Sequence, residues 1–333
     1  MTTIREVAEK AGASVTTVSH VINETRHVSE EVRLRVLDAM KELNYRPNAL
    51  ARSLRMGQTH TLALILPDSA NPFFADVGRA VEDCAFQFGY SVILCNTQGD
   101  PRREYLYLDV LSKKQVDGII FVATGDQVDS LNFLRSRAMP VVVVNRDLSG
   151  VGVDLIFTDN RQGGYLATRH LLSLGHTRIA CIAGPSDLTL GADRVLGYRY
   201  ALEEGGLPYD ERLVLAGDYQ PASGFRVACQ LLAYTDRPTA IFACNDLMAV
   251  GALRAAVEIG CRVPADLSVI GFDDIELARY TNPPLTTIAQ DKAEIGSQAV
   301  RRLMERMRAK DGPFQRLVLP TSLVLRESTG PAA

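Results

Sequence analysis

The stretch that decides the fold lies near the amino terminus and reads TIREVAEKAGASVTTVSHVIN, residues 3–23. Apolar residues recur at positions 4, 7, 8 and 11, which is the spacing of a short amphipathic helix, and Gly12 is expected to end it. Ser14 is a good N-cap for a second helix, whose inner face would hold Val15, Val18 and Ile22. Two short helices joined by a tight turn indicate a helix-turn-helix unit.

The outer face of the second predicted helix carries short hydrogen-bonding side chains in place of long solvated charges. These residues are Thr16, Thr17, His20 and Asn23. Hydroxyl and imidazole groups donate or accept hydrogen bonds at close range, which suits the edges of bases in a major groove. The alternative is a small three-helix packing unit that binds nothing.

A third helix is predicted after Ser29, its expected N-cap, with Val32, Val36, Met40 and Leu43 as its apolar stripe and Pro47 at its end. Residues 48–55 read NALARSLR and form a fourth helical stretch of about two turns, too short to be stable alone. A duplex would hold this stretch if Arg52 and Arg55 met phosphates while Leu54 wedged between base steps. A plain linker helix is the alternative.

Residues 3–55 as a whole resemble the DNA-binding headpiece of the LacI-type family of bacterial transcription regulators. The resemblance implies that Val15, Thr16 and His20 read bases, that Thr17, Ser19 and Asn23 hold phosphates, and that Leu54 opens the central base step. The full set of DNA contacts that it implies is Thr3, Val15, Thr16, Thr17, Ser19, His20, Asn23, Ala51, Leu54 and Arg55. His20 stands where many relatives carry arginine, so the half-site resembles that of the ribose- and purine-repressor branch.

Charge and composition agree with a small, weakly basic DNA-binding unit on a larger, acidic body. The net charge is −3, yet residues 1–58 carry nine basic and seven acidic side chains, a net +2. A net charge of only +2 predicts that a single copy binds DNA modestly, because affinity depends on the number of phosphates that are neutralised. We therefore expect a homodimer that binds a near-palindromic operator. No apolar run approaches 18 residues and no signal sequence is evident, so we expect a cytoplasmic protein without a membrane span.

The cysteines and histidines give no sign of a metal or cofactor. Six cysteines show no CxxC pair and are expected to be reduced core residues. The five histidines lack metal-ligand spacing, and His170 and His176 are expected to cap or pack at a helix end. We therefore expect no metal and no cofactor.

From residue 61 onward, short apolar strands alternate with helical stretches, which is typical of parallel sheets covered by helices. One set of strands is predicted at 62–66, 91–95, 118–122, 141–145 and 155–158, and a second at 179–183, 213–217, 240–244, 269–272 and 286–289. No G-x-G-x-x-G, Walker or G-x-S-x-G motif follows any of them, which disfavours an enzyme with a nucleotide cofactor.

The body resembles the periplasmic sugar-binding fold that the LacI-type family carries. The expected fold class is an all-α helix-turn-helix headpiece (1–46) and a hinge helix and linker (47–58), joined to an α/β body (59–330) of two doubly wound parallel-sheet subdomains. The first subdomain would span about 60–160 plus 291–320, and the second about 161–290 plus 321–330, with crossings near residues 158–160, 290–291 and 320–321. Ligands would bind in the cleft, at the carboxyl ends of the strands.

Polar and aromatic residues follow the predicted strands at these ends, and a polyhydroxylated ring needs such partners. Taken singly, each could be structural; Asp246 and Asp273, for example, could cap helices. As a set they match the family's pentose-binding pattern, which implies contacts from Phe73, Phe74, Asn145, Arg146, Arg194, Tyr219, Asn245, Asp273 and Gln290. Asn145 departs from the usual aspartate, and Ala123 or Thr124 replaces an asparagine, which weakens ribose in particular.

The sequence therefore predicts a transcriptional repressor controlled by a small sugar, with a pentose favoured. A purine would want arginine and threonine where Leu188 and Leu190 stand, although a nucleoside stays open. A solute-binding protein would show a signal peptide and no headpiece. A sugar-processing enzyme would need a carboxylate pair at a strand end, for which Asp246 and Asp273 are the candidates.

Overall fold

The computed structural model describes residues 2–23, 25–45, 58–122, 132–134, 137–145, 152–185, 189–309 and 312–332. The chain divides into two compact units, Met1–His60 and Thr61–Ala333, called here the headpiece and the body. The predicted hinge helix, with Ala51, Leu54 and Arg55, lies outside the described residues, as do Arg146, Ala123 and Thr124. No helix in the described part is long and apolar enough to cross a membrane.

The headpiece contains α1 (Ile4–Ala11), α2 (Val15–Asn23) and α3 (Glu30–Glu42). Thr3 caps α1 in a capping box with Glu6, and Gly12 ends the helix in the left-handed conformation at φ 60°. The hydroxyl of Ser14 accepts a hydrogen bond from the amide of Thr17 at 3.0 Å and so begins α2. A small apolar core holds the three helices together. Its buried residues are Val7, Ala8, Ala11, Val18, Val21, Val36 and Ala39.

Two details of the headpiece differ from the sequence prediction. Val15 was expected on the inner face, but 41% of it is exposed, because the first residue of α2 precedes the turn that packs on α1 and α3. Val21 takes the inner position instead. Ser29 stands at the N-cap of α3, yet its side chain makes no capping hydrogen bond. Its backbone carbonyl still accepts from Arg33, so the helix begins where predicted.

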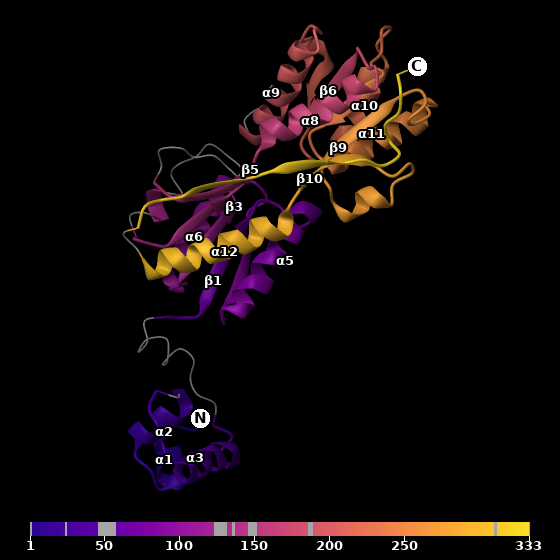
Figure 1. Cartoon of the computed structure of the whole chain (residues 1–333). Helices are drawn as coiled ribbons and strands as arrows, with labels where there is room; N and C mark the ends of the chain where they lie inside the picture. Colours follow the sequence, from indigo (N-terminus) through magenta and orange to yellow (C-terminus); the bar gives the residue numbers. More distant parts are fainter. Residues whose placement is uncertain are drawn as a thin grey trace. The chain divides into compact units, whose positions relative to one another are not determined.

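The first sheet of the body is a six-stranded parallel sheet in the order β11-β5-β4-β3-β1-β2. Figure 1 shows helices α5 and α12 lying beside this sheet. Alternate residues of β1 pack on opposite faces: Leu62, Leu64 and Leu66 join one apolar cluster, whereas Ala63 and Ile65 join another. Burial on both faces explains why these strands are continuous apolar runs. The elements are β1 (Thr61–Leu66), α5 (Pro72–Gln87), β2 (Ser91–Asn96), α6 (Pro101–Lys113), β3 (Gly118–Val122), β4 (Val141–Val144), β5 (Asp154–Thr158), α12 (Lys292–Arg308) and β11 (Arg316–Leu319).

The second sheet has the order β12-β10-β9-β8-β6-β7, and only the β10–β12 pair is antiparallel. Helices α8 and α9 contact each other, as do α10 and α11. The elements are α8 (Asn160–Ser173), β6 (Ile179–Ala183), α9 (Thr189–Glu204), η1 (Glu211–Leu213), β7 (Val214–Ala216), α10 (Pro221–Leu232), β8 (Ala240–Ala243), α11 (Asp246–Ile259), β9 (Ser268–Asp273), η2 (Glu276–Arg279), β10 (Thr286–Gln290) and β12 (Thr321–Val324). The ten strands predicted from the sequence are all present.

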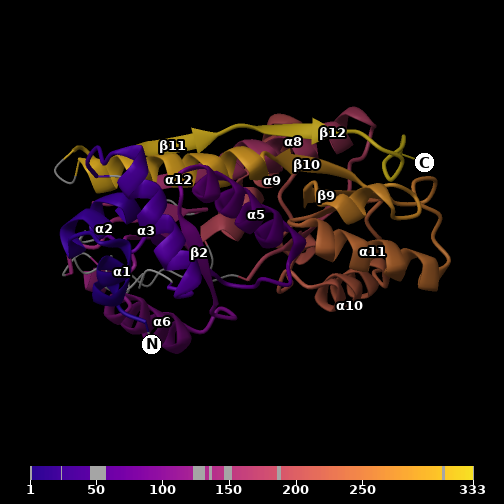
Figure 2. The same ribbon diagram turned by 90° about the horizontal axis from the view of Figure 1, so that it is seen from below.

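The chain passes between the two sheets three times. It leaves the first sheet after β5, returns after β10 through α12, and leaves again between β11 and β12, where Pro320 separates the two strands. Figure 2 shows β11 and β12 following one another along one edge of the body. These two edge strands were not predicted, because each spans only four residues and most of its positions are exposed or half-buried.

Candidate ligand cleft and nucleic-acid interface

A cavity of about 470 Å³ lies between the two sheets of the body, at the carboxyl ends of their strands. Seven of the nine predicted ligand residues line it, namely Phe73, Phe74, Asn145, Arg194, Tyr219, Asn245 and Asp273. Gln290 stands behind them, since its side-chain amide donates to Asp273 Oδ1 at 2.7 Å. Arg146, the ninth, is not described. Five polar residues that were not predicted also line the cavity: Asp68, Asn71, Gln98, Asp218 and Gln220.

The missed residues share a signal that the sequence did contain. Each lies within a few residues of a strand end, as Asp68 does after β1 and Asp218 after β7. Asp68 and Gln220 also join the two halves of the cavity wall, because Gln220 Nε2 donates to Asp68 Oδ2 at 3.2 Å. This hydrogen bond bridges the cleft.

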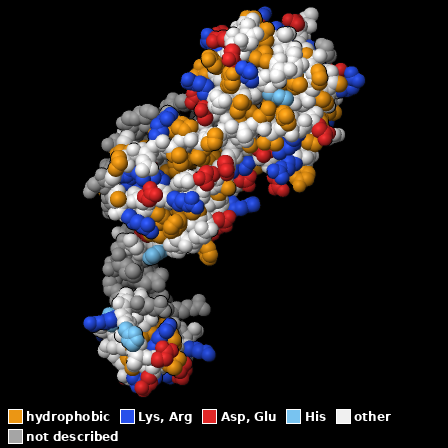
Figure 3. All heavy atoms as spheres, in the orientation of Figure 1, with side chains coloured by type: hydrophobic (Ala, Val, Ile, Leu, Met, Phe, Trp, Pro, Cys, Tyr) orange, Lys and Arg blue, Asp and Glu red, His pale blue; other side chains and the backbone are white. Residues whose placement is uncertain are grey.

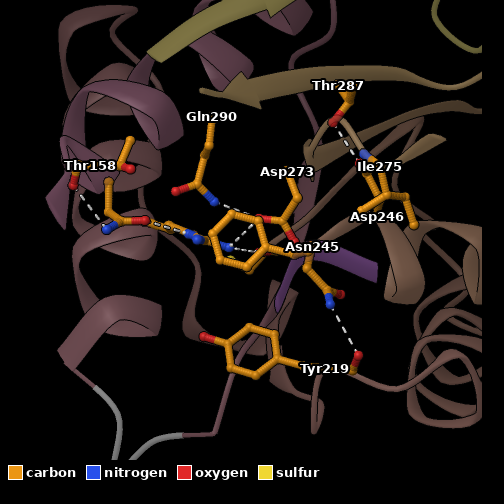
Figure 4. A network of polar contacts seen from close by, with 12 residues as sticks. Thr158, Tyr219, Asn245, Asp246, Asp273, Ile275, Thr287 and Gln290 are labelled. Carbon is orange, nitrogen blue, oxygen red and sulfur yellow. Dashed lines mark hydrogen bonds and ion pairs between the residues drawn. The ribbon is translucent and has the colours of Figure 1, made fainter. Parts of the chain in front are cut away.

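Arg194 is a buried cation in the wall of the cavity, with 4% of its surface exposed. Figure 4 shows Asp273, which lies near Arg194, and Gln290 pointing toward each other. Arg194 extends from α9, which packs so tightly on α8 that a Cβ atom at Gly164 would overlap the Arg194 carbonyl oxygen. The guanidinium lies 3.7 Å from the centroid of the Phe272 ring, donates to Asn160 Oδ1 at 2.8 Å and donates to the Cys244 carbonyl. These contacts fix its direction before any ligand binds.

Asp273 is the carboxylate that faces this cation, with Arg194 Nη1 at 3.6 Å from its Oδ1. Burial raises the pKa of Asp273 to about 6, although Arg194, the Gln290 hydrogen bond and Lys292 act in the opposite direction. Its backbone adopts φ 116°, and Asn145 and Tyr219 also have positive φ, at 67° and 64°. Non-glycine residues held in this region are characteristic of binding sites.

Asn245 and Asp246 divide structural and site roles between them. Asn245 caps α11, since its Oδ1 accepts from the Met248 amide at 2.9 Å, and its Nδ2 donates to the Tyr219 carbonyl at 3.0 Å. Asp246 is fully buried and accepts from Thr287 Oγ1 at 2.5 Å and from the Ile275 amide at 2.8 Å. Burial raises the pKa of Asp246 well above its ordinary value. Because Asp246 does not line the cavity, the expected carboxylate pair does not face a ligand.

Three polar atoms around the cavity are buried and have no hydrogen-bond partner within the described residues: Asn145 Oδ1, Tyr219 OH and Gln290 Oε1. The Tyr219 ring lies beside Gly184, where a Cβ atom would overlap its hydroxyl oxygen. Burial also raises the pKa of this phenol, which therefore stays protonated and can donate. A buried donor or acceptor without a partner costs about 1–3 kcal/mol. A ligand with hydroxyl groups would remove that cost.

The second candidate interface is the outer face of α2 in the headpiece. Val15 and Thr16 are exposed, and Thr17, Ser19, His20 and Asn23 are half-buried. Figure 3 shows histidine atoms at the surface of the headpiece, and acidic and basic side chains interspersed over the visible face of the body. The structure thus places the six predicted contacts of α2 along one short helix, while Thr3 caps α1.

No set of three or more histidine, cysteine, aspartate or glutamate residues could hold a metal ion in the part of the chain that is described. All six cysteines are free, and five of them are buried, as expected for core residues. His176 is also buried: its Nδ1 lies 2.9 Å from Thr239 Oγ1 and its Nε2 lies 3.0 Å from the Gly330 carbonyl.

Comparison with known proteins gives a consistent result over the full length. A family model described as bacterial regulatory proteins, lacI family, matches residues 3–48, and one described as a periplasmic binding protein-like domain matches residues 168–329. The HTH-type transcriptional repressor PurR of Mannheimia succiniciproducens is 42% identical over 329 residues, which cover 98% of each chain.

Two solved structures show the same arrangement. The lac repressor dimer bound to operator and the anti-inducer ONPF is similar with a TM-score of 0.90 and 33% identity, over 99% of both chains. A LacI family transcriptional regulator from Enterococcus faecium with bound ribose has a TM-score of 0.76 and 32% identity, over 82% of this chain and 100% of that one.

Proposed function

The chain belongs to the LacI family of bacterial regulatory proteins, and on that premise we propose that it represses transcription under the control of a small sugar, most simply a pentose. The resemblance drawn from residues 3–55 and from the body is thereby confirmed. The protein is a DNA-binding regulator that acts as a homodimer on operator DNA and responds to a small molecule. Its relatives are regulators and not enzymes.

The observation that carries the sugar assignment is a set of buried polar atoms around an aromatic-walled cavity that have no hydrogen-bond partner among the described residues. Asn145 Oδ1 and Gln290 Oε1 need donors, and Tyr219 OH needs an acceptor. A sugar hydroxyl supplies both functions at one atom, whereas an apolar ligand supplies neither. Phe73 and Phe74 stand edge to face, with ring centroids 5.3 Å apart, and offer apolar surface to the C–H face of a sugar. The relative solved with ribose supports a pentose.

A nucleoside or purine is the second candidate effector, favoured by relatives that carry the name PurR. The same aromatic wall would accept a base, and Arg194 with Asp273 would accept its polar edge. The segment after Pro185, which contains Leu188 and Leu190, decides between the two candidates. Its side chains lie outside the described residues.

In the proposed mechanism, the sugar shifts an equilibrium between two arrangements of the subdomains. A ligand held by residues of both sheets favours the arrangement in which all of them reach it. The three crossings between the sheets would carry that shift to the headpieces of the dimer, through the hinge helices with Leu54. Coupling between two such sites is typically about 1–3 kcal/mol, enough to release an operator.

Exposed apolar side chains on α6, including Tyr105, Leu106 and Val110, are available for contact with the second copy in the dimer.

The test has two stages and can begin without a defined operator sequence. Full-length protein is first used to select genomic fragments, and the enriched fragments define the operator. A thermal-shift panel of ribose, other pentoses, hexoses, nucleosides and purine bases then identifies the effector, because a bound ligand raises the melting temperature by mass action. The proposal predicts that a pentose both stabilises the protein and changes its operator affinity. Stabilisation by purines alone would transfer the assignment to the second candidate, and no enriched fragment would refute operator binding.

A further inference from the structure

We propose that Thr25 is a positioning residue for DNA recognition, whose hydroxyl holds the His20 imidazole in the direction in which it meets a base. This inference rests on the proposed function and on the base-reading role that the family resemblance implies for His20. It adds a residue that lies beyond the recognition helix and that the family resemblance did not assign.

The geometry that carries the inference is one hydrogen bond between two side chains. His20 Nδ1 lies 2.8 Å from Thr25 Oγ1. His20 belongs to the last turn of α2, whereas Thr25 lies two residues beyond its end at Asn23. The hydroxyl therefore reaches the ring from outside the helix, and Nδ1 is occupied within the protein. The structure shows no partner for Nε2 among the described residues, which leaves this nitrogen to face DNA.

The rest of the α2 face is held in a similar way, but by contacts within the helix or at its cap. Ser14 Oγ and Thr17 Oγ1 lie 2.8 Å apart, and Asn23 Nδ2 donates to the Ser19 carbonyl at 2.7 Å. The polar face of α2 is thus largely ordered before DNA is present. His20 carries the longest of these side chains, and its ordering depends on a residue elsewhere in the chain.

A preset ring direction raises affinity because the side chain loses less freedom on binding. An exposed histidine otherwise samples several rotamers, and ordering such a side chain lowers affinity by about 2- to 10-fold. The threonine hydroxyl donates to Nδ1 when that nitrogen is unprotonated and accepts when it carries the proton. Thr25 consequently fixes the direction of the ring and leaves the base to select which nitrogen carries the hydrogen.

The experiment compares variants of the full-length dimer on an operator panel in which each base pair is replaced in turn, with random duplex as reference at one salt concentration. Thr25→Val keeps the shape and removes the hydroxyl, and Thr25→Ser restores the hydroxyl. Thr2→Val is the matched control, because Thr2 Oγ1 donates to the Leu43 carbonyl within the headpiece. Thermal denaturation of each variant verifies that the headpiece is folded.

Thr25→Val should lower operator affinity by about 3- to 10-fold. It should also reduce the discrimination between bases at the operator position where His20→Ala reduces it. Affinity for random duplex should not change, Thr25→Ser should recover the preference, and Thr2→Val should leave it intact. The His20→Ala, Thr25→Val double variant should bind no worse than His20→Ala alone, because the two residues act as one unit.

Two results overturn the inference and are distinguishable from each other. In the first, His20→Ala removes the base discrimination at an operator position where Thr25→Val leaves it unchanged, or Thr25→Val weakens binding to operator and to random duplex equally. Thr25 then has no positioning role, and the proposed function stands. In the second, His20→Ala changes the base discrimination at no operator position. His20 then does not read a base, and Thr25 has no role in positioning it.

Discussion

Replacing Asp273 with asparagine should stabilise the protein and weaken its effector binding at the same time. The carboxyl is buried, and its pKa in the folded protein is raised from 3.8 to about 6. Folding therefore favours the protonated form, so stability is lost as the pH rises from 3.8 through 6. The difference between the two pKa values corresponds to about 3 kcal/mol at neutral pH. An asparagine side chain cannot ionise and avoids this loss.

The effector should respond in the opposite direction. The ionised Asp273 accepts charge-assisted hydrogen bonds, which contribute about 1.5–3 kcal/mol each, so Asp273→Asn should weaken the effector by about 10- to 100-fold. Binding is measured by calorimetry with the effector found in the thermal-shift panel. A site that sacrifices stability for binding is expected to show this trade-off.

The stability arm uses urea denaturation at one protein concentration, at pH 7.5 and pH 4.5, without ligand. The free energy of unfolding of Asp273→Asn should exceed that of the wild type by about 3 kcal/mol at pH 7.5, and the gap should shrink at pH 4.5. Asp218→Asn removes an exposed carboxylate from the same cavity and controls for the change of charge. Equal stability of Asp273→Asn and wild type at pH 7.5, or a gap that does not depend on pH, would refute the reasoning.

Three further substitutions probe the cleft cation, a buried ion-pair cluster and a buried histidine. Arg194→Ala should abolish the effector response and leave operator affinity intact, because the guanidinium binds within the cleft; a normal response in a gel-shift assay would contradict the assignment. Asp154→Ala should lower the free energy of unfolding by about 3–5 kcal/mol, since Arg302 and Arg306 each hold this buried carboxylate at 2.7 Å, and urea denaturation measures it. His176→Gln should reduce the loss of stability on acidification: burial lowers the pKa of His176 below 6.5, so the unfolded chain takes up the proton first and wild-type stability falls as the pH drops through 6.5. An unchanged difference between pH 7.5 and pH 5.5 would exclude that role.

The sequence predicted the fold closely because its signals are local and repeated. Apolar runs marked strands β1 to β10 of the body, and the spacing of Ile4, Val7, Ala8 and Ala11 marked the first helix. The edge strands β11 and β12 escaped prediction, since each has only four residues, most of them exposed or half-buried, and so short a segment has no distinctive periodicity. Val15 was misplaced because the first residue of a helix does not follow the periodicity of the turns behind it.

The site was predicted less completely, and the reason is physical. Strand ends identified Asn145 and Asp273 as cleft residues, but nothing local reveals that Gln220 reaches across to Asp68, 152 positions away. Asp246 shows the same limit. It adjoins a cavity residue in sequence, yet its carboxyl turns into the protein toward Thr287. Only the packing of β8, β9 and β10 decides which of two neighbouring polar side chains faces a ligand.

The late return of the chain to the first sheet has a consequence for biosynthesis. Asp154 is made about half-way through translation, whereas its partners Arg302 and Arg306 emerge near the end. Until then the nascent first subdomain lacks α12 and its outer strand, and apolar residues of α5 such as Val77 and Val81 stay uncovered. All strands of the second sheet except β12 precede α12 in the chain, the last of them being β10, which ends at Gln290. A ribosome stalled near residue 290 should therefore expose a half-finished first subdomain to chaperones and proteases.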